Sequence, residues 1–543
     1  MNLSDLGKQA GRVETITVDA PYIADPLNAY AAIAGHNSIL LESAEINSKD
    51  NLKSLLLVDA ALRIQCDSNV VTVEGLSANG QAVLPFLQAH LSDMLTPHAD
   101  ESGSSVHTLT FTFPLPDPNL DEDARLKQDS VFDVLRILKT KIKALRNHPH
   151  AVFVGGVFAY DLLATFERLP SVKDAKNTCP DYVFYLSETL ILVDHQHQST
   201  QILGSVFSGE NVAESYFAVH QRLEFLKQKL SAACDTKSIS TENLLLPNDN
   251  ITVTESKDDA AYCEDVNKLK ENILDGDIFQ VVPSRTFSID CPKPLLAYLQ
   301  LKLTNPSPYM FYMNDKQFVI FGASPESALK YDASSNLVEV YPIAGTRPRG
   351  KREDGSIDVD LDSRLELDLQ QDEKEKAEHI MLVDLARNDV ARVCEAGSRF
   401  VKDLLKVDRY SHVMHLVSRV VGSLRSDLDA LHAYQACMNM GTLVGAPKIS
   451  AASLIRETEL ERRGSYGGAV GYFNGQGDFD TCIVIRSAFV KDGIAHVQAG
   501  AGVVNDSVAQ SEADETRAKA QAVISAIKRS HSDPVSTGVN THE

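Results

Sequence analysis

The sequence predicts an α+β fold in which large antiparallel β-sheets pack as a sandwich, with helices on the outside and two intertwined halves. Short apolar runs bounded by turn residues dominate the first half of the chain and indicate strands. Helical periodicity appears between them, but it does not alternate regularly with strands as a parallel βαβ sheet would require. Antiparallel pairing is therefore favoured over a doubly wound sheet.

The first half contains most of the predicted strands and one amphipathic helix. Apolar, turn-bounded runs predict strands over residues 54–64, 70–74, 108–113 and 182–193. A helix is predicted over residues 129–146, where apolar residues recur at helical spacing: Val131, Val134, Leu135 and Leu138.

A polar, irregular stretch at residues 231–257 marks the predicted boundary between the halves. We therefore expect an N-terminal half of residues 1–245 and a C-terminal half of residues 250–529. The polar tail, residues 530–543, is expected to be disordered.

The second half is predicted to open with a helix and a strand. Ser256 is the expected N-cap, and Gly276, after Asp275, ends the helix. The inner face of this helix carries Tyr262, Val266, Leu269 and Ile273. A strand over residues 278–282 follows, and mixed helices and strands continue to about residue 529.

Composition excludes several classes of function. The 543-residue chain carries a net charge of −22 and a pI near 5.2, so nucleic acid and anionic membranes are unlikely partners. The eight cysteines are scattered without a C-x-x-C pair, which argues against a zinc site or a disulfide framework. No signal peptide or spanning segment is evident, and a reducing cytoplasm is expected.

Four glutamates could form an oxygen-rich site. They are Glu375 and Glu378, in a helix predicted over residues 372–390, and Glu512 and Glu515, in the last helix. Residues three apart share one face of a helix, so the two pairs could converge on Mg²⁺, which takes one or two protein carboxylates. The alternative is an ordinary exposed helix with an ion pair between Glu515 and Lys519.

Other polar residues are ambiguous when taken singly. Gly500, Ala501 and Gly502 could bring backbone N–H groups close to an anion, or could form a plain turn. Arg486, inside an apolar run predicted as a strand over residues 482–489, should be edge-facing or paired with an anion. His415 is either a hydrogen-bonded core residue or a general acid/base. A basic run is either solvated or faces an acidic ligand: Arg347, Arg349, Lys351 and Arg352.

Seven segments link these signals. They are residues 40–43 (LLES), 276–280 (GDIFQ), 305–310 (NPSPYM), 322–327 (GASPES), 342–346 (PIAGT), the helix 372–389 and 466–468 (YGG). In residues and in order they resemble the chorismate-utilising enzymes, and among them the anthranilate synthase large subunits. The resemblance covers nearly the whole chain.

The resemblance implies roles for the candidate residues. Glu378 and Glu515 would be Mg²⁺ ligands, supported by Glu375 and Glu512, and the metal would hold the ring carboxylate of chorismate. The implied substrate contacts are Gly345, Thr346, Tyr466, Arg486, Gly500, Ala501 and Gly502. Arg486 and Tyr466 would grip the enolpyruvyl carboxylate. The implied catalytic residues are His415, which would help to eject pyruvate, with Glu326, Thr442 and Lys519.

Two positions bear on the nucleophile. Relatives that activate water carry a lysine where this chain has Gln280, and the folate-pathway relative carries a nucleophilic lysine where it has Ala344. An amide cannot act as that base and a methyl group cannot attack the ring, so ammonia is the expected nucleophile. The resemblance thus implies amination of chorismate and release of pyruvate to form anthranilate.

The resemblance also implies feedback inhibition by L-tryptophan, the end product of the pathway. The implied regulatory residues, shared between the two halves, are Leu41, Glu42, Ser43, Lys53, Pro308, Tyr309 and Met310. Glu42 and Lys53 would face the amino acid zwitterion, while the prolines and Met310 would flank the indole.

Ammonia needs a source. No cysteine here has the glycine-flanked setting of a glutaminase nucleophile, so a separate glutamine amidotransferase subunit is expected, in a heterotetramer of two large and two small subunits. Two alternatives stay open: an enzyme that stops at aminodeoxyisochorismate, and a catalytically silent tryptophan-binding regulator. A nucleotide-binding enzyme has no supporting motif.

Overall fold

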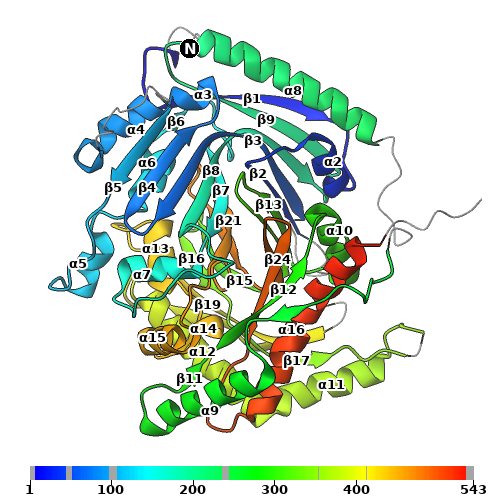
Figure 1. Cartoon of the computed structure of the whole chain (residues 1–543). Helices are drawn as coiled ribbons and strands as arrows, with labels where there is room; N and C mark the ends of the chain where they lie inside the picture. The colour runs from blue at the N-terminus through cyan, green and yellow to red at the C-terminus, as the bar shows by residue number, and fades with distance from the viewer. Residues whose placement is uncertain are drawn as a thin grey trace, which may run out of the picture.

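The computed structural model describes residues 6–43, 52–96, 107–234, 244–352, 354–410 and 413–532. Within these ranges, the named strands pair antiparallel, except for a short parallel pairing of β1 (Arg12–Ala20) with β6 (Lys143–Ala144). The predicted α+β class with large antiparallel sheets is confirmed (Figure 1). No helix in the described part has the length and hydropathy needed to span a bilayer.

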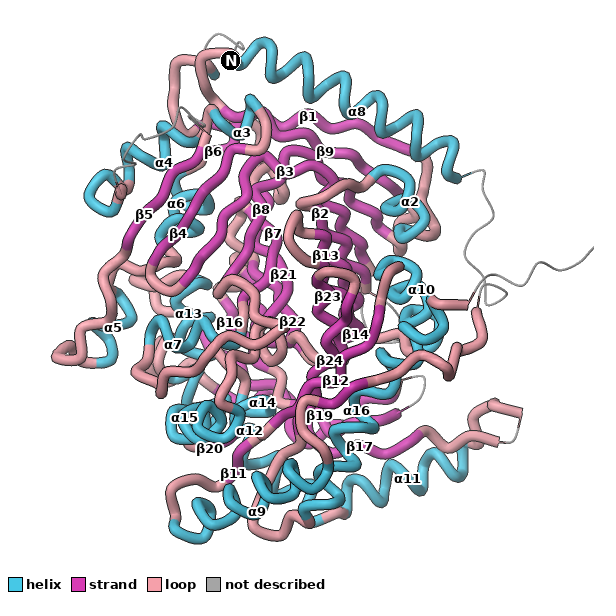
Figure 2. The backbone as a smooth tube through the Cα atoms, in the orientation of Figure 1, coloured by secondary structure: helices cyan, strands magenta, loops and turns pink. Residues whose placement is uncertain are grey.

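Two runs of paired strands diverge from β3 (Lys53–Asp67), as Figure 2 shows. The first run passes through β8 (Tyr182–Asp194), β7 (Phe153–Phe158), β21 (Ala469–Asn474), β22 (Phe479–Ile483), β15 (Ser327–Asp332), β16 (Leu337–Val340) and β19 (Val413–Ser423). The second passes through β2 (Ser38–Glu42), β13 (Tyr309–Asn314), β14 (Val319–Ser324), β23 (Ser487–Lys491), β24 (Ile494–Gly500) and β12 (Ser284–Asp290). Each run mixes strands from both halves of the chain, so the halves are intertwined.

Further strands extend both regions. Around β3 and β8 the sheet also contains β1, β4 (Val70–Gly75), β5 (Thr108–Thr112) and β9 (Ser199–Phe207). At the far end of the first run, β19 pairs with β17 (Ile343–Pro348) and β18 (Phe400–Arg409).

Helices cover the outside of the strands (Figure 1). Helix α8 (Val212–Cys234) lies along β1 and β9, and α10 (Pro294–Thr304) packs beside α16 (Ala509–Ser530). Helix α12 (Glu373–Ala391) packs on β17 and β19, and α9 (Asp259–Asp275) packs on α16. Helices α12 and α16 therefore come to the far ends of the two strand runs.

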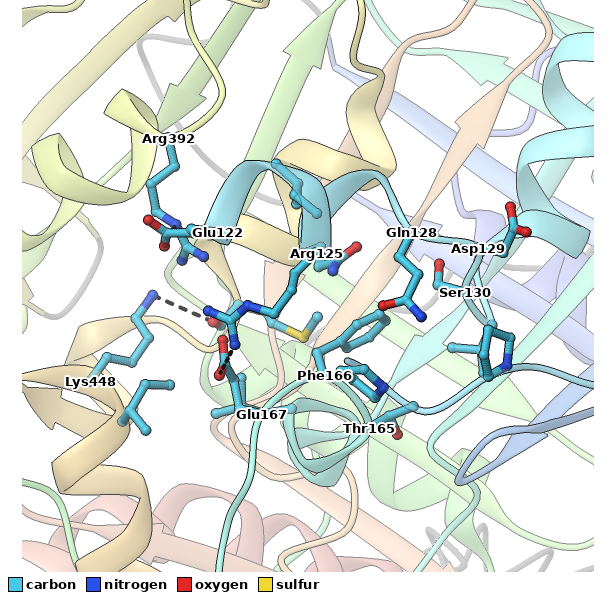
Figure 3. A pocket seen from close by; sticks show the side chains of 18 residues that line it. Glu122, Arg125, Gln128, Asp129, Ser130, Thr165, Phe166, Glu167, Arg392 and Lys448 are labelled. Atoms are coloured by element: carbon cyan, nitrogen blue, oxygen red, sulfur yellow. Dashed lines mark hydrogen bonds and ion pairs between the residues drawn. The ribbon is translucent and has the colours of Figure 1, made fainter. Parts of the chain in front are cut away.

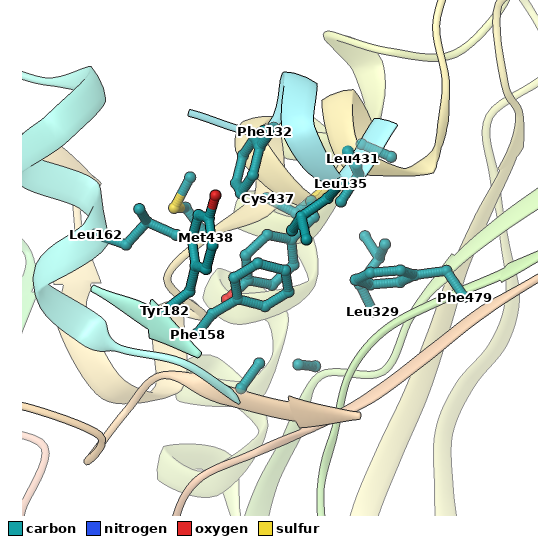
Figure 4. Packing of buried hydrophobic residues seen from close by; sticks show 14 of the residues in the cluster. Phe132, Leu135, Phe158, Leu162, Tyr182, Leu329, Leu431, Cys437, Met438 and Phe479 are labelled. Carbon is teal, nitrogen blue, oxygen red and sulfur yellow. The ribbon is translucent and has the colours of Figure 1, made fainter. Parts of the chain in front are cut away.

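A buried aromatic cluster ties the two halves together (Figure 4). Phe158 of β7 stacks on Tyr434 of α13 (Ala430–Cys437), with ring centroids 4.3 Å apart. Tyr182 donates a hydrogen bond of 2.6 Å to the carbonyl of Val131, which precedes α6 (Asp133–Lys141). Because the cluster draws on both halves, neither half can bury its apolar surface alone.

The four strands predicted in the first half are confirmed as β3, β4, β5 and β8. The helix predicted over residues 129–146 is shorter, since α6 ends at Lys141 and Lys143–Ala144 then pairs with β1 as β6. The predicted strand over residues 278–282 is reduced to β11 (Gln280–Val281). Residues 235–243 of the predicted boundary and 533–543 of the predicted tail lie outside the described residues.

The helix predicted to open the second half is α9, and it ends as expected with Gly276 in the left-handed region at φ 86°. Its N-cap is Asp258 rather than Ser256, because the Asp258 carboxylate accepts from the N–H of Ala261. The Ser256 hydroxyl instead accepts from the N–H of Thr286 in β12.

Candidate active site

Carboxylates from helices α12 and α16 act on one another. Burial, aided by the negative charges of Glu375, Glu512 and Glu515, raises the pKa of Glu378 to about 7. The positive charge of Lys374 opposes the shift. Because charges are largely screened beyond roughly 10 Å at moderate salt, these acids from two helices distant in sequence are within electrostatic reach of one another.

The ion pairs of these acids differ in length. They are Glu375 with Arg347 at 3.3 Å, Glu378 with Lys374 at 4.0 Å and Glu515 with Lys519 at 2.6 Å. The pair between Glu515 and Lys519 is the one expected of an ordinary exposed helix. Glu378 is half-buried and its ion pair is long, so its charge is poorly compensated and a nearby cation would stabilise it.

A cation held by these acids would have to keep most of its water. Among the described residues, no group of three or more His, Cys, Asp or Glu side chains is arranged to hold a metal ion. A closed cage of protein ligands is therefore absent from this part of the chain. Glu378 and Glu515 together fit the one or two carboxylates that Mg²⁺ uses at sites where substrate and water supply the remaining ligands.

Arg486 lies where the chain crosses between the two strand runs. The predicted strand over residues 482–489 is broken here, because β22 pairs with β15 and β21, whereas β23 pairs with β14 and β24. Arg486 lies at this break and has a left-handed φ of 49°. Burial lowers the pKa of its guanidinium, and the charges of Tyr466, Glu515 and Glu326 oppose this shift. None of the salt bridges in the described part of the chain includes Arg486, which leaves its fork available to an anion.

The chain packs closely where β24 ends, at Gly500 and Gly502. A Cβ at Gly500 would lie 3.0 Å from the Tyr466 hydroxyl and 2.7 Å from the carbonyl oxygen of Pro283. At Gly502 it would lie 2.8 Å from Gln280 Nε2. The contact at Gly500 is with backbone that cannot shift cheaply, so glycine is required at the end of β24, whereas the Gln280 side chain could move away from a side chain at position 502. Ala501, between the two glycines, is buried.

Thr346 and His415 form a pair on β17 and β19. Thr346 Oγ1 lies 2.9 Å from His415 Nδ1. Gly345 precedes Thr346 with φ 83°, at a bulge between Ala344 and Thr346. Burial lowers the pKa of His415 below its usual range, so the ring is neutral near pH 7.

Glu326 is a buried acid beside these groups. Thr442 donates a hydrogen bond of 3.1 Å to Glu326 Oε1. Burial raises the pKa of Glu326 to about 8, although this hydrogen bond and the charges of Lys519 and Arg486 favour its ionised form. Lys519 also donates to the carbonyl of Gly500 at 3.0 Å, which ties α16 to the end of β24. At neutral pH, Glu326 therefore holds a proton that it can donate.

The residues predicted to bind tryptophan lie close together at the pairing of β2 with β13. Leu41 pairs with Phe311 and Glu42 with Met310. Ser43 Oγ donates to the carbonyl of Pro308 at 3.2 Å, next to Tyr309. Residues 44–51, which follow Ser43, lie outside the described residues.

Of the predicted regulatory side chains, Glu42 has other partners, and Lys53 lies on the neighbouring strand β3. The buried Glu42 carboxylate accepts from Tyr298 and Lys302 of α10, both at 2.6 Å. Lys53 is exposed at the start of β3 and pairs in register with Asp194. The Glu42 carboxylate thus has a structural role in the core, which spacing along the sequence could not show.

A surface pocket elsewhere contains none of the predicted site residues (Figure 3). It lies beside α5 (Glu122–Lys127), and its cations are paired within the protein. Lys448 Nζ lies 2.6 Å from Asp389, and Arg125 lies 3.6 Å from Glu167. Because these charges are already neutralised, the pocket is a weaker candidate for chemistry than the acid and arginine site.

Comparison with known proteins assigns the family. A family model described as a chorismate binding enzyme matches residues 110–525. The chain belongs to the chorismate-binding enzyme family. Relatives named "Anthranilate synthase component 1" include one from Vibrio cholerae, 56% identical over 530 residues, covering 96% of this chain and 98% of the relative. Another, from Escherichia coli, is 54% identical over 525 residues with the same two coverages.

Solved structures of chorismate-binding enzymes share the fold. Anthranilate synthase component I from Streptococcus pneumoniae is 28% identical, with a TM-score of 0.67, covering 93% of this chain and 99% of that one. The menaquinone-specific isochorismate synthase from Escherichia coli is 17% identical, with a TM-score of 0.64 and 97% of both chains covered.

One residue near the site of this chorismate-binding enzyme has a role that neither sequence interpretation gave. Arg347, expected either to be solvated or to face an acidic ligand, instead contacts three carboxylates of the protein: Asp368 in α11 (Val359–Gln371) at 2.7 Å, and Asp372 and Glu375 at the start of α12, at 2.8 Å and 3.3 Å. Asp372 is also the N-cap of α12. The acidic residues downstream of the basic run were the available signal, because opposite charges on neighbouring elements tend to pair.

Proposed function

We propose that this chain is the large, chorismate-using subunit of an anthranilate synthase. In the proposed reaction, ammonia adds to the ring of chorismate beside its carboxylate, and the allylic hydroxyl leaves as water, giving aminodeoxyisochorismate. Elimination of pyruvate then aromatises the ring to anthranilate. The observation that carries the proposal is that Glu515 acts electrostatically on both Glu378 and Arg486, in a chain 56% identical to a protein of that name.

Arg486 is the proposed anchor for a carboxylate of chorismate. Its guanidinium is a planar fork that matches a carboxylate with two parallel hydrogen bonds. Tyr466, whose hydroxyl lies by the backbone of Gly500, acts electrostatically on this guanidinium. Thr346 would add a contact from the opposite strand run, so both runs would enclose the substrate.

Glu378 and Glu515 are the residues that would hold Mg²⁺, with Glu375 and Glu512 beside them. When bound, Mg²⁺ would neutralise the ring carboxylate and draw electron density toward it as a Lewis acid. The protein's own contribution is to hold Glu378, whose charge is poorly compensated, within electrostatic reach of Glu515, so that the two acids favour a divalent cation and its anionic ligand together.

Two residues are suited to proton transfer. Glu326 is protonated at neutral pH and would donate to the departing hydroxyl group. His415 is neutral and bonds Thr346 through Nδ1, which leaves Nε2 to accept the ring proton lost during aromatisation. Glu326 would thus donate a proton, and His415 would accept one.

We expect kcat/KM to fall as pH rises through about 8, because Glu326 of the free enzyme then loses the proton that it donates. Because burial raises this pKa, the protonated, active form persists to higher pH than for an ordinary glutamate. Measuring kcat/KM across this range in the wild type and in Glu326→Gln tests this expectation, and the variant should be slower and lack this decline. Glu339→Gln, at another buried glutamate, should keep it. An unchanged alkaline decline in Glu326→Gln would rule out this proton donor.

Ammonia is the proposed nucleophile. Gln280 lies against Gly502 at the site, where an amide cannot deprotonate water. Ala344 lies next to Gly345 and offers no nucleophile. A glutaminase subunit would supply the ammonia in an assembly of two large and two small subunits. The seven described cysteines are free, which suits our proposal of a reducing cytoplasm.

L-Tryptophan is the proposed inhibitor, bound near Ser43, Pro308 and Met310. Replacing Ser43 by phenylalanine places a large ring against the carbonyl of Pro308, and overpacking of this kind costs about 1–3 kcal/mol. The tryptophan concentration for half-inhibition should therefore rise roughly tenfold or more, since 1.4 kcal/mol corresponds to tenfold. Turnover without tryptophan should persist. Ser335→Phe, at an exposed turn, is the matched control, and unchanged inhibition in Ser43→Phe would contradict the site.

The proposal is tested by product analysis. The purified chain is incubated with chorismate, ammonium and Mg²⁺, and with EDTA as a control. Anthranilate fluorescence and an equal amount of pyruvate are expected, and EDTA should abolish both. Accumulation of aminodeoxyisochorismate without pyruvate would indicate the shorter reaction. Absence of any turnover would indicate a silent regulator.

A further inference from the structure

A buried chain of hydrogen bonds links helix α12 to the bulge that presents Thr346. His379, one residue after Glu378, is fully buried. Its Nδ1 lies 3.3 Å from the carbonyl oxygen of Ala344, and its Nε2 lies 2.7 Å from Ser418 Oγ. His379 therefore joins α12 to both β17 and β19 in the interior.

The direction of these hydrogen bonds is determined by the backbone. The N–H of Leu405 donates to Ser418 Oγ at 3.0 Å, so the hydrogen of the Ser418 hydroxyl is free to donate to His379 Nε2. A ring that accepts at Nε2 carries its hydrogen on Nδ1, where it donates to the carbonyl of Ala344. Only the Nδ1–H tautomer gives each of these buried polar groups a hydrogen-bond partner.

Both ends of this chain of hydrogen bonds lie at irregular backbone. Leu405 has a left-handed φ of 54° at a register shift in β18, and the bulge of β17 follows Ala344. Beyond that bulge, Thr346 contacts His415 at 2.9 Å. A Cβ at Gly345 would lie 3.2 Å from Glu375 Oε2, so α12 and the bulge are in close contact.

We infer that His379 is a positioning residue, which holds the β17 bulge against α12 so that Thr346 and His415 meet the substrate in register with the carboxylates. This inference rests on the proposed function. His379 itself is not catalytic, because it is enclosed by protein and cannot touch the substrate. An error of about 1 Å in such a site can cost about 100-fold in rate.

The kinetic test uses three variants. His379→Leu removes both hydrogen bonds, and His379→Asn can still place an N–H near the carbonyl of Ala344. His195→Leu is the matched control, since both nitrogens of His195 are also bonded, to Tyr22 and Ser54, far from the site in the first half of the chain. We expect His379→Leu to lower kcat/KM about 100-fold, His379→Asn to recover about tenfold of this, and His195→Leu to change it little.

A second measurement does not depend on turnover. The ¹⁵N chemical shifts of labelled histidines report the tautomer, and His379→Asn identifies the signal by its loss. We expect the Nδ1–H form for His379. An Nε2–H tautomer, or equal losses of kcat/KM in His379→Leu and His195→Leu at comparable Tm, would overturn the inference. If His379→Leu does not fold, Ser418→Ala replaces it, and kcat/KM is expected to fall in that variant as well. Lack of turnover in the wild type would instead count against the proposed function, and the tautomer would still decide the role of His379.

Discussion

Replacing Glu515 by glutamine is expected to lower Mg²⁺-dependent anthranilate formation at least about 100-fold, since loss even of groups that only support a metal ligand costs 10–100-fold. The amide keeps the shape of the side chain but removes the charge that acts on Glu378 and Arg486. The Mg²⁺ concentration needed for half-maximal rate should rise. Activity as a function of Mg²⁺ measures both effects.

Stability should change little in this variant. Glu515 is half-exposed and its pair with Lys519 is an ordinary helical ion pair, worth at most about 1 kcal/mol. Asp514→Asn is the matched control, because Asp514 is an exposed carboxylate on the same turn of α16. Equal activity of Glu515→Gln and Asp514→Asn would remove Glu515 from the metal site.

Replacing Arg486 by methionine is expected to separate activity from stability. Removing one partner of a buried charge pair costs about 2–5 kcal/mol, so kcat/KM for chorismate should fall by about 30-fold or more, mainly through KM. Without substrate, however, burial disfavours the charged guanidinium, as the lowered pKa shows. The variant should therefore unfold at the same or a higher temperature than the wild type.

Two measurements check this prediction. Steady-state kinetics give KM, and thermal unfolding without ligand gives Tm. Arg486→Lys retains the charge but loses the bidentate fork, so it should lie between the wild type and Arg486→Met in kcat/KM. An unchanged KM in Arg486→Met would show that the guanidinium does not contact the substrate.

The elements with strong local patterns could be predicted from the sequence. Apolar runs bounded by turn residues predicted β3 and β8, and helical periodicity with Gly276 predicted the body and end of α9. The break at Arg486 could not be predicted in this way. Apolar character continues through it, and only pairing with strands distant in sequence moves the chain from one run to the other.

In the candidate site, too, local patterns predicted one part and could not predict another. The spacing of Glu375 and Glu378 predicted that both acids share one face of a helix, a local property. Convergence with Glu512 and Glu515 came from the family resemblance, because no local pattern relates α12 to α16. The partners of Glu42, namely Tyr298 and Lys302, were missed because they are brought by α10 from the other half of the chain.

The most direct test of the central claim is a titration of the purified chain with Mn²⁺, a paramagnetic substitute for Mg²⁺, followed by electron paramagnetic resonance in the presence of chorismate. The site described here predicts one bound ion per chain, with weaker binding in both Glu378→Gln and Glu515→Gln. Unchanged stoichiometry and affinity in both variants would contradict a metal site shared between α12 and α16.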